Sequence, residues 1–243
     1  SGFTLSGDFP LTKPLQQHAG GLSDAVALKL RRDGSDFVFG TWLGGAGEDE
    51  AEGLAVDRDG RMYLTGHTSS EDFPTVGALQ DRLGDGNTDA FAVRLAADGG
   101  RLEYATFLDV SGSDVGWGVA AGPDGSATVV GTTVATVDLD AFAIRLSPNG
   151  DRVVYERLIR TTERDEAYAV DVDAMGDAFV AGHTLSRRFP VIAAVQDRSG
   201  GQEDGFLVKL AGDAGTLVTA TYLGGNGRDF AYAVAVDAEG RVW

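Results

Sequence analysis

Residues 43–49 read Leu-Gly-Gly-Ala-Gly-Glu-Asp, and the chain continues through Ala55-Val56-Asp57 to Gly66-His67-Thr68. This plan returns in three further copies, which start at Asp114, Asp165 and Asp229. The last copy is cut off at Trp243, and its missing remainder appears at the other end of the chain as Ser1-Gly2-Phe3-Thr4. Repeats of this size bury their apolar faces only against one another. The four-fold repeat therefore decides the architecture.

A second aspartate recurs ahead of an alternating apolar run in every copy, at Asp24, Asp89, Asp140 and Asp204. Each of them stands 25 residues before the aspartate that opens the next copy. Only the interval that leads up to this second aspartate varies in length, from 9 residues after Gly131 to 23 residues after Gly66. Variation confined to one interval indicates a surface loop above a constant framework.

Each copy is expected to fold into four short strands, which in the best-defined copy lie near residues 50–56, 61–65, 90–95 and 102–108. In the first strand, large residues alternate with small, mostly apolar ones, and a period of two is the strand signal. We expect the bulky face of this strand to pack against the small face of its neighbour. Turns such as Asp57-Arg58-Asp59-Gly60 supply the positive φ that hairpins need. Four short antiparallel strands in a repeat of this length predict a β-propeller blade.

We therefore predict an all-β fold, a β-propeller of four-stranded antiparallel blades, with four blades in a single domain of residues 1–243. The last blade would be shared between the N- and C-termini, which would remove exposed sheet edges. The predicted blades comprise residues 231–243 with 1–42, then 43–108, 109–158 and 159–223. A fragment of a larger propeller and a pair of chains that build one eight-bladed ring are the alternatives.

The recurring motifs resemble the bacterial β-propeller repeat that is labelled SBBP. The likeness rests on Leu43–Asp49, Ala55–Asp57, Gly66–Ser69, Asp72-Phe73-Pro74 and Asp89-Ala90-Phe91. The third copy departs from the pattern, because it lacks Phe-Pro and its loop, and has Gly122 in place of the aspartate after the first strand. The resemblance implies a large secreted or surface protein of a bacterium, so we expect an extracellular, cell-surface or periplasmic location.

The composition narrows the range of partners. The net charge is −17, with 37 acidic and 20 basic residues, so the field of the protein repels phosphate backbones and anionic lipid surfaces. We expect a protein or carbohydrate partner, no nucleic acid and no insertion into a membrane, because no apolar run approaches the length of a membrane span. The chain has no Cys, which excludes disulfides, thiolate metal sites and Cys nucleophiles.

Two groups of residues are candidates for a site. Four aspartates that begin the innermost strand would encircle the axis of a closed ring and could hold Ca²⁺ there, namely Asp49, Asp114, Asp165 and Asp229. The alternative is that each accepts hydrogen bonds from its own Gly-rich turn. A possible ligand rim is formed by His67, His183, Phe73 and Phe189. The alternative for the two phenylalanines is that they pack their loops onto the blades.

The sequence offers little support for catalysis. The Gly-Xaa-Ser-Xaa-Gly motif of hydrolases is absent, and the Gly-rich strings precede strands rather than helices, so they provide no phosphate site. We therefore expect a non-catalytic binding or scaffolding module that presents an acidic, loop-rich face to a partner. An enzyme or a Ca²⁺-dependent carbohydrate-binding domain that uses the same face is the alternative. An enzyme would be expected to have a deep pocket over the axis, with His67 or His183 and two or more carboxylates within hydrogen-bond reach of one another.

Overall fold

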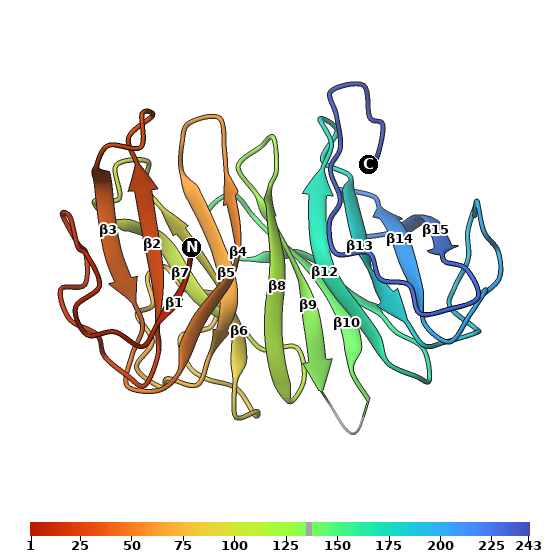
Figure 1. Cartoon of the computed structure of the whole chain (residues 1–243), viewed down its shortest axis with the longest axis horizontal. Helices are drawn as coiled ribbons and strands as arrows, with labels where there is room; N and C mark the ends of the chain where they lie inside the picture. Colours follow the sequence, from red (N-terminus) through yellow and green to blue (C-terminus); the bar gives the residue numbers. More distant parts are fainter. Residues whose placement is uncertain (135–137) are drawn as a thin grey trace. The chain divides into compact units, whose positions relative to one another are not determined.

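The computed structural model describes residues 1–134 and 138–243, and every regular element in these ranges is a β-strand (Figure 1). Within each sheet, every strand pairs antiparallel with the next strand of the chain. The predicted all-β fold of four-stranded antiparallel blades is confirmed. In the described ranges, no helix has the length and apolar character needed to cross a membrane.

Three of the sheets have four strands. The first contains β4 (Asp49–Val56), β5 (Met62–Thr68), β6 (Asp89–Leu95) and β7 (Leu102–Leu108). The second contains β8 (Ser113–Ala121), β9 (Ala127–Val134), β10 (Asp140–Leu146) and β11 (Val153–Ile159). The third contains β12 (Asp165–Val172), β13 (Ala178–Thr184), β14 (Asp204–Leu210) and β15 (Leu217–Leu223). The strands predicted near 50–56, 61–65, 90–95 and 102–108 fall on β4 to β7.

The remaining sheet has three strands, β1 (Gly2–Thr4), β2 (Asp24–Leu30) and β3 (Phe37–Leu43). Thr4 pairs with Asp24 of β2, as Thr68 pairs with Asp89 in the sheet of β4 to β7. The N-terminal residues therefore occupy the position of a second strand, as the alignment of the copies predicts. At the other end of the chain, a bridge joins Val236 to Val242 across a turn. The sharing of one blade between the two termini stays a prediction.

The chain divides into two compact units, and the single propeller domain stays a prediction. Unit 1 comprises residues 1–116 and 149–151, and unit 2 comprises residues 117–148 and 152–243. Each has its own hydrophobic core: Phe91 and Phe107 lie in the core of unit 1, and Phe206 and Tyr222 in that of unit 2.

A glycine in the turn between the third and fourth strands packs on an aromatic ring from the fourth strand of the preceding sheet. The pairs are Gly99 on Phe39, Gly150 on Tyr104 and Gly215 on Tyr155. All three glycines have positive φ, and a β-carbon at any of them would come within 2.7 Å of the ring. Only glycine satisfies both constraints. The contact with Tyr104 places the turn of residues 149–151 in unit 1.

The prediction that the first strand packs through its bulky face is wrong for β4. Ala51, on the small face, is buried, whereas Leu54 and Val56, on the bulky face, are 45% and 57% exposed. The small face is needed where first strands of successive sheets converge. In unit 2, a β-carbon at Gly118 of β8 would lie 2.8 Å from the carbonyl oxygen of Tyr168 in β12. The pairing of β4 with β5 is also interrupted by a bulge at Glu52.

Candidate functional site

The four aspartates that open the first strands share one local structure. The carboxylate of each accepts a hydrogen bond from the backbone N–H four residues earlier, at 2.7–2.8 Å. The donors are Gly45 to Asp49, Val110 to Asp114, Thr161 to Asp165 and Gly225 to Asp229. Each of these carboxylates therefore closes the loop that precedes its own strand. This is the arrangement expected of a structural aspartate, and the metal site at these four residues stays a prediction.

Backbone hydrogen bonds tie each of these aspartates to the sheet before it. The N–H of Asp49 donates to the carbonyl oxygen of Ser23 at 2.9 Å, and the N–H of Asp165 donates to that of Leu139 at 2.8 Å. The acceptor is in both cases the residue before the second recurring aspartate. This contact explains the constant spacing of 25 residues. It brings the second recurring aspartate of one sheet next to the aspartate that opens the following sheet. Such a pair is called here a junction pair.

The junction pairs are Asp24 with Asp49, Asp89 with Asp114, Asp140 with Asp165 and Asp204 with Asp229. Burial is the main cause that raises the pKa of Asp89 and that of Asp165 to about 6. The negative charge of the partner aspartate adds to the increase in both cases. At the first junction, Asp49 accepts hydrogen bonds from Thr68, Ser70 and Gly45. These hydrogen bonds lower its pKa and oppose the increase that burial causes. The junctions thus differ in how well their charge is compensated.

His67 of unit 1 lies beside two carboxylates. It stands directly opposite Glu50 in the register of β4 and β5, and Glu52 follows on the same face at the bulge. One ligand atom from each of these three side chains lies within 4.8 Å of the others. His67 Nδ1 is buried and has no hydrogen-bond partner among the described residues. Two carboxylates and an imidazole are donors that suit Zn²⁺ or another divalent transition metal.

The equivalent place in unit 2 is closed by its neighbours. His183 stands opposite Glu166, and Tyr168 takes the place of Glu52. Arg164 forms an ion pair with Glu166, and the Tyr168 hydroxyl donates to the same carboxylate at 3.0 Å. His183 is only 3% exposed, and burial lowers its pKa, so it is neutral at pH 7.

Aromatic rings gather around His183. Tyr168 stacks on it with centroids 5.5 Å apart, and Phe230 approaches at 4.6 Å. Tyr232 and Trp117 both pack against Tyr168, with ring centroids 5.1 Å and 6.2 Å from its own. The aromatic cluster is defined as these five residues of unit 2. Tyr232 is 66% exposed and Phe230 is 36% exposed, so the cluster reaches the surface.

Phe73 and Phe189 pack against rings of the blades. Phe73 stacks on Phe91 at 4.9 Å, and Phe189 stacks on Phe206 at the same distance. Both phenylalanines are buried. Each of these loops also bridges to a fourth strand, through Val76 to Ala105 and through Ile192 to Ala220. The contacts of both phenylalanines are therefore those of a packed loop.

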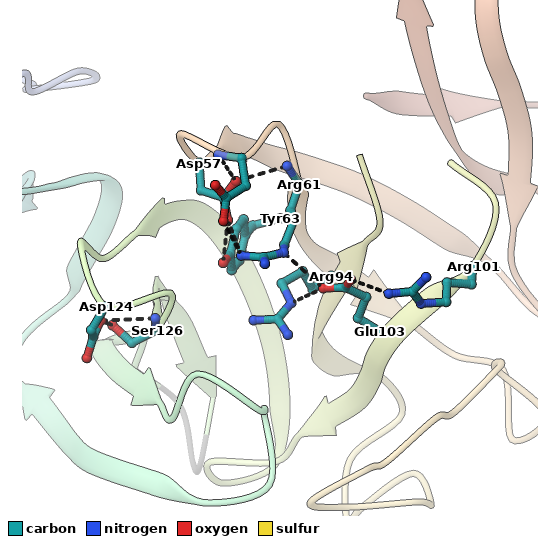
Figure 2. A network of polar contacts seen from close by, with 9 residues as sticks. Asp57, Arg61, Tyr63, Arg94, Arg101, Glu103, Asp124 and Ser126 are labelled. Carbon is teal, nitrogen blue, oxygen red and sulfur yellow. Dashed lines mark hydrogen bonds and ion pairs between the residues drawn. The ribbon is translucent and has the colours of Figure 1, made fainter. Parts of the chain in front are cut away.

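The sequence analysis missed a basic residue that recurs near the end of the third strand, at Lys29, Arg94, Arg145 and Lys209. Arg94 Nε lies 2.8 Å from Glu103 Oε2, and its guanidinium carbon lies 5.0 Å above the ring of Tyr104. Figure 2 shows that Arg61 and Arg101 also approach Glu103. In unit 2, Lys209 lies 2.8 Å from Asp177. The recurrence of a basic residue at this position was the signal in the sequence. The ion pairs of Arg94 and Lys209 indicate that its role is structural.

Comparison with known proteins supports the repeat. Residues 39–74 match the family model described as SBBP, a beta-propeller repeat. A gluconolactonase from Xanthomonas campestris is similar in structure, with 16% sequence identity and a TM-score of 0.40 over 88% of this chain. The match spans 59% of that enzyme's chain. No curated protein matches the sequence. Residues 39–74 therefore carry the SBBP β-propeller repeat, and the resemblance drawn from the sequence is confirmed.

Proposed function

We propose that this chain is a non-catalytic binding module of a secreted or cell-surface bacterial protein, and that the aromatic cluster of unit 2 contacts its partner. The observation that carries the proposal is the exposure of Tyr232 and Phe230 above rings that hold them in place. Tyr and Trp dominate the binding energy of many protein interfaces, because they bring large contact area with few rotatable bonds.

The surroundings of the cluster favour a protein partner. Arg228 forms an ion pair with Glu203, and its guanidinium carbon lies 5.7 Å from the centre of the Phe230 ring. Arginine and carboxylate groups around exposed rings match the polar rim of a protein interface. The net charge of −17 favours a partner of basic charge.

The cluster is also poorly suited to acid–base chemistry. His183 is enclosed between Tyr168 and Phe230, and Arg164 and Tyr168 occupy the carboxylate of Glu166. A general base must reach a substrate proton within hydrogen-bond distance, and burial keeps His183 from doing so. Binding therefore fits these residues better than catalysis.

A selection of phage-displayed random peptides against the immobilised protein tests the proposal. We expect enrichment of basic peptides, with binding weakened at least about tenfold in Tyr232→Ser, which removes an interface aromatic. Phe3→Ser is the control, because Phe3 is another exposed ring, but in unit 1. Peptides that bind Tyr232→Ser as tightly as the wild type would contradict the proposal.

The alternative, a metal-dependent enzyme or carbohydrate-binding domain, is favoured by one observation. One ligand atom from each of Glu50, Glu52 and His67 lies within 4.8 Å of the others, a spacing that suits the ligands of one metal ion. Calorimetric titration with ZnCl₂ and MnCl₂ tests this second candidate. It predicts binding that His67→Ala abolishes, and His18→Ala serves as the control because His18 lies outside the group. Equal binding by wild type and His67→Ala would remove the support for the alternative.

A further inference from the structure

The four junction pairs differ at one nearby position, five residues before the aspartate that opens the first strand. This position is Gly44, Asp109, Arg160 and Gly224 in the four copies. Two copies thus have no side chain there, and one has an arginine whose Nη1 lies 4.0 Å from Asp140 Oδ2. At this position, only the copy with Asp89 and Asp114 has a carboxylate.

The carboxylate of Asp109 lies next to those of Asp89 and Asp114. One oxygen each from Asp89, Asp109 and Asp114 lies within 4.8 Å of the others. The absence of a side chain at Gly84 leaves room for Asp109, since a β-carbon on this glycine would be 2.3 Å from Asp109 Cγ. Asp85 adds a further negative charge and raises the pKa of Asp109, although burial is the larger cause. Carboxylates this close repel one another unless a cation compensates them.

The oxygens of Asp89 give the independent indication of a ligand. Asp89 is 0% exposed. Its Oδ2 accepts hydrogen bonds from the N–H of Gly84 at 2.7 Å and from Gln80 Nε2 at 3.3 Å. Its Oδ1 has no hydrogen-bond partner in the described part of the chain. A buried carboxylate oxygen without a partner is costly, so Oδ1 is the atom left for a ligand.

We propose that Asp89, Asp109 and Asp114 bind a hard divalent cation, with Ca²⁺ as the best fit. Ca²⁺ takes oxygen ligands at about 2.4 Å, so two of its ligands lie at most about 4.8 Å apart. The spacing of the three carboxylates meets that limit. Water can complete the coordination, because Asp109 is exposed to solvent. The cation would compensate the negative charge at this junction, as the guanidinium of Arg160 does at the junction of Asp140.

The repeat supplies the variant that tests this proposal. Asp109→Gly restores the residue found at Gly44 and Gly224, so the fold should tolerate it. Calorimetric titration of the EDTA-treated protein with CaCl₂ should show binding to wild type, at least about tenfold weaker binding to Asp109→Asn and none to Asp109→Gly. Asp81→Asn removes the same charge from a side chain that is 74% exposed, and it should bind as wild type does.

Thermal melts of wild type and Asp109→Gly, in CaCl₂ and in EDTA, give a second readout. Millimolar CaCl₂ should raise the Tm of wild type by about 5 °C and leave that of Asp109→Gly unchanged. In EDTA, Asp109→Gly should melt above wild type, because it lacks the repulsion of the third carboxylate. Equal binding of Ca²⁺ by wild type and Asp109→Gly would overturn the proposal. So would the absence of calcium binding to wild type.

Discussion

Gly150 lies against the ring of Tyr104 so closely that a β-carbon built on it would be 2.5 Å from Tyr104 Cγ. The same relationship joins Gly99 to Phe39 and Gly215 to Tyr155. In the sheet of β1 to β3, the equivalent turn glycine is Gly34, which has the same φ of 70° as Gly150 but no atom within 4 Å of such a β-carbon. The two glycines therefore separate backbone strain from steric contact.

Gly150→Ala should destabilise the protein much more than Gly34→Ala. Both variants force an alanine into positive φ, which costs about 1 kcal/mol. Gly150→Ala also pushes a methyl group into the ring of Tyr104, which adds about 2 kcal/mol. Urea unfolding followed by circular dichroism measures both free energies. Equal losses in the two variants would show that the ring contact has no energetic weight.

The buried carboxylate of Asp165 should make unfolding depend on pH. Burial raises its pKa from the ordinary 3.8 to about 6, with Asp140 contributing, so the folded state binds the proton more tightly than the unfolded chain. The stability from this group is complete below about pH 4 and is lost as the pH rises through 6. The expected loss over this whole range is about 3 kcal/mol.

Asp165→Asn should remove that part of the pH dependence, because asparagine resembles the protonated acid. Relative to wild type, this variant should gain stability between pH 4.5 and pH 7.5, measured by urea unfolding. Asp213→Asn removes the same charge at an exposed position and serves as the control. Parallel pH profiles for Asp165→Asn and wild type would contradict the assignment.

Phe73→Ala should destabilise the protein by about 3 kcal/mol, because it empties a buried site between Phe91 and Phe107. Val76→Ala, in the same loop, should cost less than about 1 kcal/mol, since Val76 is exposed. Differential scanning calorimetry compares the two variants. If Phe73→Ala melted like the wild type, the ring would be free to serve as the rim residue that the sequence suggested.

Arg94→Met should cost about 2 kcal/mol, because it removes the nearest cation from Glu103 while Arg61 and Arg101 still compensate part of its charge. The side chains of Arg94 and Glu103 are only 12% and 14% exposed, and Arg94 also stacks over Tyr104. The double variant Arg94→Met with Glu103→Leu should recover at least half of that loss, because no buried charge is left without its partner. Additive losses, measured by urea unfolding of the three variants, would argue against this coupling.

Most of the fold could be predicted from the sequence because its signals are local. Alternation and Gly turns located β4 to β7, and the repeat related Thr4 to Thr68. The bulge at Glu52 gave no such signal, because a bulge depends on pairing with β5. Alternation alone also could not reveal that Ala51 is buried and Leu54 exposed, because it does not say which face a neighbouring sheet covers.

The candidate sites were harder to predict because they combine residues from different sheets. The sequence marked Asp114 but not Asp109, since the meaning of Asp109 depends on Asp89 lying at the same junction. The aromatic cluster had a signal, because Trp117, Tyr168 and Tyr232 occupy equivalent positions in successive copies. Their contact with one another and the exposure of Tyr232 required coordinates.

The contact between a turn glycine and the preceding sheet's ring has a consequence for how such proteins gain length. Tyr104, on the fourth strand of its copy, receives Gly150, while Gly99 in the same copy inserts against Phe39. One copy of the gene segment thus encodes both halves of the connection. A tandem duplication in frame would supply a new ring and a new glycine together, so the chain could evolve toward more copies without inventing a new interface.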